Sequence, residues 1–173
     1  WNLFFEKPWS LRGMQNLMMD YHLAPDHIRR LHEAMANQYV RYVEEAKLRL
    51  EPDGYWTSDD LGHQTGPMMH PDTFHELIYP YYCEVGEAVH RNGMHFWLHS
   101  CGDNTLLLPD LIDAGVDVFH PVQKHTMDEP AGACEFGGSI TFLTGIDVQH
   151  VLQEADTEGV REEVRFLIDT FDR

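Results

Sequence analysis

The chain has 173 residues, of which 43% are hydrophobic and 24% charged, and its formal net charge is -17. This composition is typical of a globular protein with its own core, and the acidic excess excludes nucleic acid and anionic membranes as partners, because their phosphates would be repelled. The sequence shows no run of ~18 apolar residues that could span a membrane and no signal-peptide pattern. Its three cysteines, Cys83, Cys101 and Cys134, are odd in number and scattered. We therefore expect reduced thiols and a cytoplasmic location.

The first part of the chain has helical patterns. Residues 11–20 and 25–50 carry apolar side chains near helical spacing, and Pro25 is typical of a first helical turn. We therefore predict a helical lead-in over residues 1–52, followed by strand–helix units over residues 53–173 of the same single domain.

Strand-like and helix-like segments alternate in the rest of the chain. The patterns predict strands over residues 53–57, 94–99, 116–119 and 140–144. They predict helices over residues 71–93 (kinked at Pro80), 105–114, 128–136 and 148–173, the last as one or two helices. A polar loop follows each strand, whereas the helix-to-strand turns carry glycine. This asymmetry is typical of a β/α barrel, whose site is built from the loops after the strands.

The number of strands predicts an incomplete barrel. A closed (β/α)8 TIM barrel needs eight strands and ~250 residues, whereas four strand–helix units are recognisable here. We therefore predict an α/β fold corresponding to the second half of such a barrel, with an open doubly wound sheet as the alternative. The first residue is Trp1 rather than Met, and we expect the chain to be a carboxyl-terminal piece of a longer protein.

One strand end carries two soft metal ligands, His99 and Cys101. Side chains alternate along a strand, so Phe96 and Leu98 face one side while Trp97 and His99 face the other, and one further extended step brings Cys101 to the side of His99. A neutral imidazole and a thiolate at a strand end suit a catalytic zinc site. The alternative is a histidine satisfied by the backbone beside a thiol that merely packs.

Several strand-end motifs occur together in the chain. They are Asp59-Asp60-Leu61-Gly62-His63-Gln64, Leu98-His99-Ser100-Cys101-Gly102, His120-Pro121-Val122-Gln123 and Gly145-Ile146-Asp147. In this combination the chain resembles the uroporphyrinogen decarboxylase superfamily, with motifs like those of its zinc-dependent methylcobalamin:coenzyme M and corrinoid methyltransferases. The resemblance implies a β/α barrel whose substrate funnel lies at the carboxyl ends of the strands.

The resemblance also implies a zinc site. The methyltransferase branch carries a His-x-Cys zinc pair, which His99 and Cys101 match residue for residue. Its third ligand, a thiolate nearer the carboxyl terminus, has no matching position here, so we expect that ligand beyond Arg173. The family's arginines and its catalytic aspartate for decarboxylation also lie outside the chain.

Other strand-end residues are candidates for the same site. Because neighbouring strand residues face opposite sides, one member of the pair Asp59 and Asp60 faces the funnel. The family pattern favours Asp60, which we predict as a catalytic carboxylate. The alternative is a residue of a solvated loop or a helix cap. His120, held extended by Pro121, is the second predicted catalytic residue, the alternative being a structural hydrogen bond. The predicted substrate-binding residues are Gln64, Trp97, Gln123 and Asp147.

These residues favour a zinc-dependent methyltransferase that moves a methyl group between a corrinoid or methoxylated compound and a thiol or cobalamin acceptor. Zn²⁺ is the expected cofactor and a corrinoid a possible co-substrate; the expected partners are a small-molecule substrate, a corrinoid protein and, as a homo-oligomer, further copies of the chain. Decarboxylation in porphyrin biosynthesis is the alternative, disfavoured because the strand-end loops offer Lys124 alone for carboxylates. A non-catalytic ligand- or metal-binding barrel fragment is the second alternative.

Overall fold

The computed structural model describes residues 2–172, and Trp1 and Arg173 lie outside the described part. In chain order its helices and strands are α1 (Glu6–Arg12), α2 (Met14–Leu23), α3 (Pro25–Leu50), β1 (Gly54–Ser58), β2 (Gly62–His63), β3 (Gly66–Pro67), α4 (Pro71–Leu77), α5 (Tyr79–Arg91), β4 (His95–His99), α6 (Leu108–Asp113), β5 (Val118–His120), α7 (Glu129–Phe136), β6 (Thr141–Phe142), α8 (Val151–Glu154) and α9 (Thr157–Phe171).

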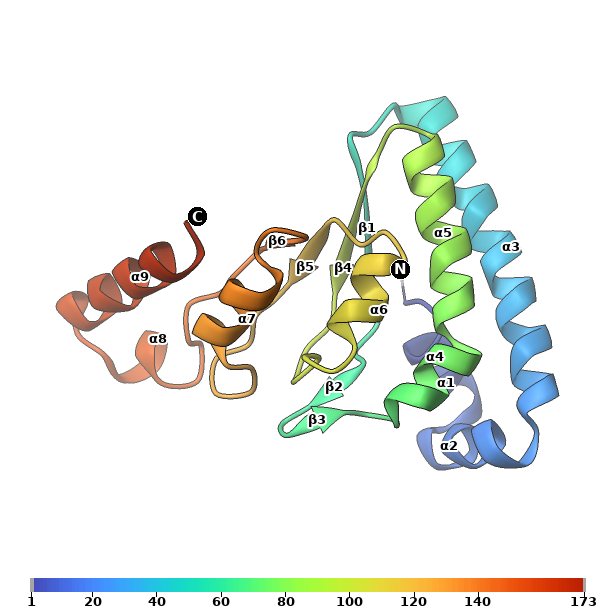
Figure 1. Ribbon diagram of the computed structural model, residues 1–173, viewed down its shortest axis with the longest axis horizontal. Helices are drawn as coiled ribbons and strands as arrows, with labels where there is room; N and C mark the ends of the chain where they lie inside the picture. Colours follow the sequence, from blue (N-terminus) through green and yellow to red (C-terminus); the bar gives the residue numbers. More distant parts are fainter. Residues whose placement is uncertain (1, 173) are drawn as a thin grey trace.

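Four strands form a parallel sheet in the order β1-β4-β5-β6, and helices connect each neighbouring pair (Figure 1). This arrangement confirms the predicted α/β fold built from βα units, which is part of a TIM barrel. The pairs Trp56↔Trp97 and Ser58↔His99 set the register of β1 and β4, and His99↔His120 sets that of β4 and β5. Because all four strands run the same way, their carboxyl ends meet at one edge.

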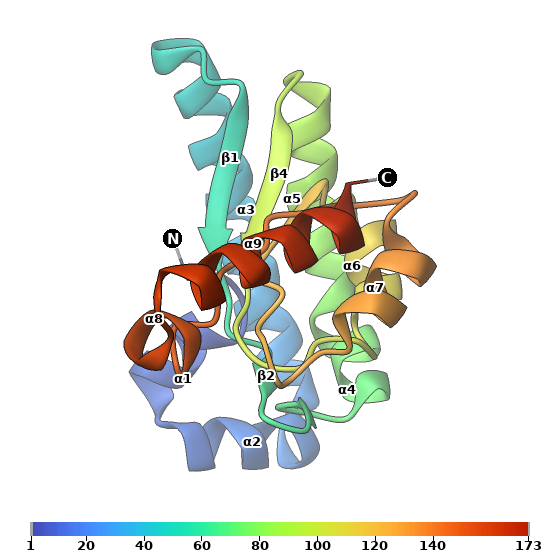
Figure 2. The same ribbon diagram turned by 90° about the vertical axis from the view of Figure 1, so that its left-hand side faces the viewer.

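The two faces of the sheet differ in burial. Phe96 and Leu98 of β4 are fully buried on the face that packs against α5, where the ring of Phe96 lies 6.4 Å from that of Tyr82. On the opposite face Trp97 is partly exposed and Trp56 is 48% exposed. Figure 2 shows β1 and β4 side by side in front of α3 and α5. Each large apolar side chain buried in this layer stabilises the fold by about 1.5–3 kcal/mol.

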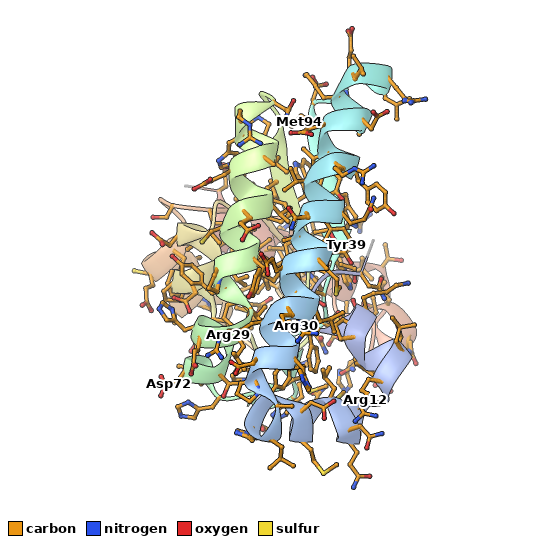
Figure 3. All side chains as sticks on the ribbon, turned by 90° about the vertical axis from the view of Figure 1, so that its right-hand side faces the viewer. Arg12, Arg29, Arg30, Tyr39, Asp72 and Met94 are labelled. Carbon is orange, nitrogen blue, oxygen red and sulfur yellow. The ribbon has the colours of Figure 1, made fainter. Side chains whose placement is uncertain are left out.

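The long helix α3 forms an outer layer on α5, and Figure 3 shows the two helices side by side. Tyr39, about midway along α3, donates a hydrogen bond from its hydroxyl to the carbonyl oxygen of Asn2 at 2.7 Å. Near the start of α3, Arg29 forms an ion pair with Glu76 of α4. The helical lead-in therefore holds both the N-terminal segment and the helices that precede β4.

Several boundaries differ from those expected. Gly13, with φ of 82°, separates α1 from α2, so the helix expected over residues 11–20 is two helices. The helix over residues 71–93 is divided at Ile78, just before Pro80, and residues 148–173 contain the two helices α8 and α9. In the described part of the chain, no helix combines the length and apolarity that crossing a membrane requires.

The N-terminal segment adds to the sheet in a way the sequence patterns did not predict. Asn2 forms a parallel bridge with Ser58, and the N–H of Leu3 donates to the carbonyl oxygen of Ser58 at 2.9 Å. This bridge extends the sheet beyond β1. Residues this close to the first helix are too few to show a strand pattern, and the two-residue strands β2 and β3, in a segment expected as a loop, are likewise too short to show one.

A buried carboxylate fixes this segment. Asp59 is fully buried and accepts hydrogen bonds from the N–H groups of Phe5 and Glu6 at 2.7–3.1 Å, and from the hydroxyl of Tyr82 at 2.9 Å. Burial raises the pKa of Asp59 to about 7, although these hydrogen bonds act in the opposite direction. Asp59 is therefore a structural residue that joins the N-terminal segment to β1 and α5.

Candidate metal centre

Three side chains with metal-ligand atoms meet at the carboxyl ends of β1 and β4. Asp60, His99 and Cys101 place their ligand atoms within 4.8 Å of one another. His99 Nε2 lies 3.4 Å from Cys101 Sγ and 3.5 Å from Asp60 Oδ1. The alternation along β4 thus continues to Cys101, which lies beside His99 as the sequence pattern predicts.

Of the two adjacent aspartates, Asp60 faces this group, as the family pattern implies. Asp59 and Asp60 are adjacent, and the structure buries Asp59 among the helices while Asp60 lies beside His99. Asp60 Oδ1 accepts the N–H of Cys101 at 2.9 Å. The sequence predicts Asp60 as a catalytic residue and a thiolate beyond Arg173 as the third metal ligand, whereas in the structure the Asp60 carboxylate is the third potential metal ligand beside His99 and Cys101.

The second predicted catalytic residue, His120, contacts His99 directly. The two Nδ1 atoms are 2.7 Å apart, which leaves Nε2 of His99 directed at Cys101 and Asp60. Burial lowers the pKa of His120, and the neighbouring imidazole of His99 lowers it further. Trp56 covers the pair, with its ring 5.3 Å from that of His120 and 6.4 Å from that of His99.

The loop that carries Cys101 is held by polar contacts from two other loops. Besides the hydrogen bond that the N–H of Cys101 donates to Asp60, Gln123 Oε1 accepts the N–H of Gly102 at 2.9 Å. A methyl group at Gly62 would lie 2.7 Å from the carbonyl oxygen of Cys101, so the two loop backbones are in close contact. Burial, with the Asp60 carboxylate, raises the pKa of the Cys101 thiol to about 11.

A cavity of about 340 Å³ begins at this group and extends along the carboxyl ends of β5 and β6. Cys101 and His120 lie at its wall together with Gln123, Lys124 and Asp147. The loops that form it lie at the lower edge of Figure 1. The volume is at the small end of the range for ligand pockets.

Lys124 is engaged by two carboxylates. Its Nζ lies 2.9 Å from Glu163 Oε2 and 3.3 Å from Glu129 Oε2, and 4.2 Å above the ring of Phe166. Both carboxylates are buried. The ammonium group is thus neutralised within the protein, although Lys124 lines the cavity.

The remaining predicted residues are placed as follows. Trp97 lies on the same face of β4 as His99, with its ring 5.9 Å from that of Trp56. Gln123 and Asp147 line the cavity, as described above, whereas Gln64 has an exposed side chain in the turn between β2 and β3. The structure therefore brings most of the predicted residues to one edge of the sheet, but not Gln64, and their roles remain predictions.

The donor set fits zinc. In a tetrahedral zinc site, metal–ligand lengths of about 2.0–2.3 Å place an imidazole nitrogen about 3.6 Å from a thiolate sulfur and about 3.3 Å from a carboxylate oxygen. The corresponding separations from His99 Nε2 are 3.4 Å to Cys101 and 3.5 Å to Asp60. A fourth position would remain, either for a substrate or for the thiolate ligand predicted beyond Arg173, which stays a prediction.

Comparisons with known proteins agree with the fold. Residues 9–173 match the family model described as uroporphyrinogen decarboxylase (URO-D), which confirms the resemblance inferred from the motifs. Among solved structures, a methyltransferase from Methanosarcina mazei is similar, with a TM-score of 0.77 and 15% sequence identity over 94% of this chain. The chain spans 46% of that structure's length, and at this identity the likeness shows the fold. Among curated proteins, none matches the chain.

Proposed function

Because the chain belongs to the uroporphyrinogen decarboxylase family, as its matched residues 9–173 show, we propose that it is the metal-binding part of a zinc-dependent methyltransferase. The observation that carries the proposal is the convergence of His99 Nε2, Cys101 Sγ and Asp60 Oδ1 at separations suited to zinc. The fold shared with a methyltransferase from Methanosarcina mazei supports the choice of reaction.

Zinc held by these three residues would supply a positive charge that favours the thiolate form of a substrate thiol at its open position. The protein's own residues would fix the geometry. His120 holds the ring of His99 through Nδ1, so that Nε2 is the atom presented to the cation. Asp60 and Gln123 hold the backbone on either side of Cys101 through the N–H groups of Cys101 and Gly102.

The substrate would lie between the metal centre and the open face of the sheet. The cavity of about 340 Å³ suits a small thiol or a methoxylated compound. Trp56, whose ring lies 5.3 Å from that of His120 at the cavity wall, offers aromatic surface where a flat or apolar group could pack, and Trp97 lies next to Trp56. A corrinoid, carried by a partner protein, would be the methyl donor or acceptor approaching from the same edge.

A reducing compartment, as in the cytoplasm, is part of this proposal, because Cys101 must remain a thiol to bind zinc. The structure records Cys83, Cys101 and Cys134 as free thiols. A homo-oligomer remains a prediction from the sequence.

Decarboxylation of a porphyrinogen is the alternative within the same family. Such a substrate carries many carboxylates, which would need free cationic groups around the cavity. Lys124 is the cation on the cavity wall, and Glu129 and Glu163 already neutralise it. The residues of this chain therefore favour methyl transfer, and a non-catalytic metal-binding fragment is the outcome if neither reaction occurs.

Metal analysis of the protein and of its Cys101→Ala variant tests the metal centre. We expect Cys101→Ala to bind one equivalent of zinc less than the parent protein. After substitution with Co²⁺, the parent protein should show a thiolate-to-cobalt absorption band that the variant lacks. Cys134→Ala is the matched control, because Cys134 is an exposed thiol on α7. Equal zinc content and an unchanged band in Cys101→Ala would refute the proposal.

Turnover separates the two reactions. The whole enzyme, of which this chain is the proposed metal-binding part, should transfer a methyl group from methylcobalamin to a thiol acceptor, and Cys101→Ala should abolish this transfer. Release of carbon dioxide from a porphyrinogen, unaffected by Cys101→Ala, would instead establish the decarboxylase alternative. If the zinc-loaded protein catalyses neither reaction, the remaining alternative is a non-catalytic metal-binding protein.

A further inference from the structure

A second group of metal-ligand side chains lies on the loops after β5 and β6. His125 Nε2 and His150 Nδ1 each lie 3.1 Å from the same oxygen, Asp147 Oδ2. The three ligand atoms are within 4.8 Å of one another, and the two imidazole rings are 5.1 Å apart. None of these residues belongs to the group formed by Asp60, His99 and Cys101.

The two oxygens of Asp147 have different partners. Oδ1 accepts the backbone N–H groups of Gln149 and His150, at 2.8 and 3.1 Å, and so fixes the turn that leads into α8. This capping contact leaves Oδ2, the oxygen that both imidazoles approach. Capping therefore uses one oxygen of the carboxylate. The contacts of His125 and His150 with the other oxygen are at hydrogen-bond distance, and the same convergence of two imidazoles and a carboxylate is what a cation site requires.

The separations suit a divalent cation. Metal–ligand lengths of about 2.0–2.2 Å place an imidazole nitrogen about 3.0–3.4 Å from a carboxylate oxygen, for octahedral to tetrahedral angles. Both measured N–O separations, 3.1 Å, lie in this range. Two imidazoles with one carboxylate form a donor set used for zinc and for other first-row divalent metals.

The surroundings leave room for exchangeable ligands. Asp147 is buried, with 4% of its side chain exposed, whereas the side chains of His125 and His150 are 55% and 58% exposed. Water can therefore complete the coordination from the solvent side. Asp147 also lines the cavity that begins at Cys101, so a cation bound to it would lie next to this cavity.

We propose that His125, Asp147 and His150 form a second divalent-cation site, selective for a borderline metal such as Zn²⁺, separate from the Cys101 centre. The bound ion would join the loop after β5 to the loop after β6 and so stiffen one wall of the cavity. Its formation depends on neither the thiol of Cys101 nor methyl transfer.

The test uses the protein with its first centre removed, as His99→Ala/Cys101→Ala. We expect this variant to bind one equivalent of Co²⁺ or Zn²⁺ in a calorimetric titration, with a cobalt spectrum that lacks a thiolate band. Adding His125→Gln and His150→Gln should weaken this binding by at least about tenfold, since loss of even the hydrogen-bond partners of metal ligands costs about 10–100-fold in affinity. Adding His22→Gln and His27→Gln, which change two exposed histidines elsewhere, should leave it unchanged.

Two outcomes would overturn the proposal. One is that the His99→Ala/Cys101→Ala variant binds no more metal than the variant that also lacks His125 and His150. The other is that removing His22 and His27 lowers uptake equally, which would indicate unspecific binding to surface histidines. If removal of the first centre disturbs folding, the same comparison is made in the protein that retains His99 and Cys101. There, His125→Gln/His150→Gln should lower the zinc content from two equivalents to one, and an unchanged zinc content would refute the second site.

Discussion

Replacing Gly102 by alanine should disturb the loop that carries Cys101 more than any comparable change elsewhere. Gly102 has φ of +83°, and a methyl group there would lie 2.6 Å from the carbonyl oxygen of Gly62 and from the backbone nitrogen of His63. The left-handed backbone conformation costs about 1–2 kcal/mol for a residue with a Cβ atom, and the steric overlap with backbone adds about 1–3 kcal/mol. Gly102→Ala should therefore lower the free energy of unfolding by about 2–5 kcal/mol.

Two other glycines separate these contributions. Gly93 has φ of +67°, but a methyl group there would meet no described atom within 4 Å, so Gly93→Ala should cost about 1–2 kcal/mol from the backbone alone. Gly138 has neither feature, so Gly138→Ala should raise the free energy of unfolding by about 0.5 kcal/mol or leave it unchanged, because alanine restricts the unfolded chain.

Urea unfolding and zinc titration of the three variants test this reasoning. Stability should fall in the order Gly138→Ala, Gly93→Ala, Gly102→Ala, and Gly102→Ala alone should also weaken zinc binding, since Gly102 follows Cys101 directly. If Gly102→Ala is no less stable than Gly93→Ala, the loops do not touch as described. If it is less stable but binds zinc normally, the contact does not position Cys101.

Three further changes probe the fold around the site. His32 is buried, and burial lowers its pKa to about 4 from 6.5, so the neutral ring is favoured in the folded state. The free energy of unfolding should therefore fall by about 3 kcal/mol as the pH decreases from 6.5 to 4. In urea unfolding, His32→Gln should show a smaller fall over the same pH range. Asp59→Ala should cost about 2–4 kcal/mol in the same assay, because the N–H groups of Phe5 and Glu6 lose their acceptor, whereas Ala at the exposed Asp53 should cost less than about 0.5 kcal/mol. Lys124→Met should lower the thermal unfolding midpoint and cost about 3–5 kcal/mol by leaving Glu129 and Glu163 buried without a cation; an unchanged midpoint would show that these carboxylates are protonated or solvated.

Local patterns predicted those parts of the site that depend on a single strand. The period of two along β4 places His99 and Cys101 on one side, and the same alternation separates Asp59 from Asp60. The parallel βα arrangement then predicts that the loops after β4, β5 and β6 lie at one edge. These features need no knowledge of which loops touch.

Contacts between distant loops could not be predicted. The hydrogen bond from the Cys101 N–H to Asp60 joins residues 41 positions apart, and the ion pair of Lys124 with Glu163 joins residues 39 apart. His125 reaches Asp147 from a backbone with φ of 65°, a conformation that few residues other than glycine adopt, although asparagine, aspartate and histidine adopt it more often than the rest. No spacing rule expresses such geometry, so both the third donor of the first centre and the second group of ligands became apparent only in the folded chain.

The packing of Trp56 against the histidines gives the site an optical signal of its own. Its indole lies 5.3 Å from the ring of His120, 6.4 Å from that of His99 and 5.9 Å from that of Trp97. Indole emission is quenched by a nearby protonated imidazole and changes when water at its surface is displaced. Fluorescence of the unlabelled protein can therefore follow metal uptake and ligand entry in real time, with Trp56→Phe as the variant in which that signal is lost.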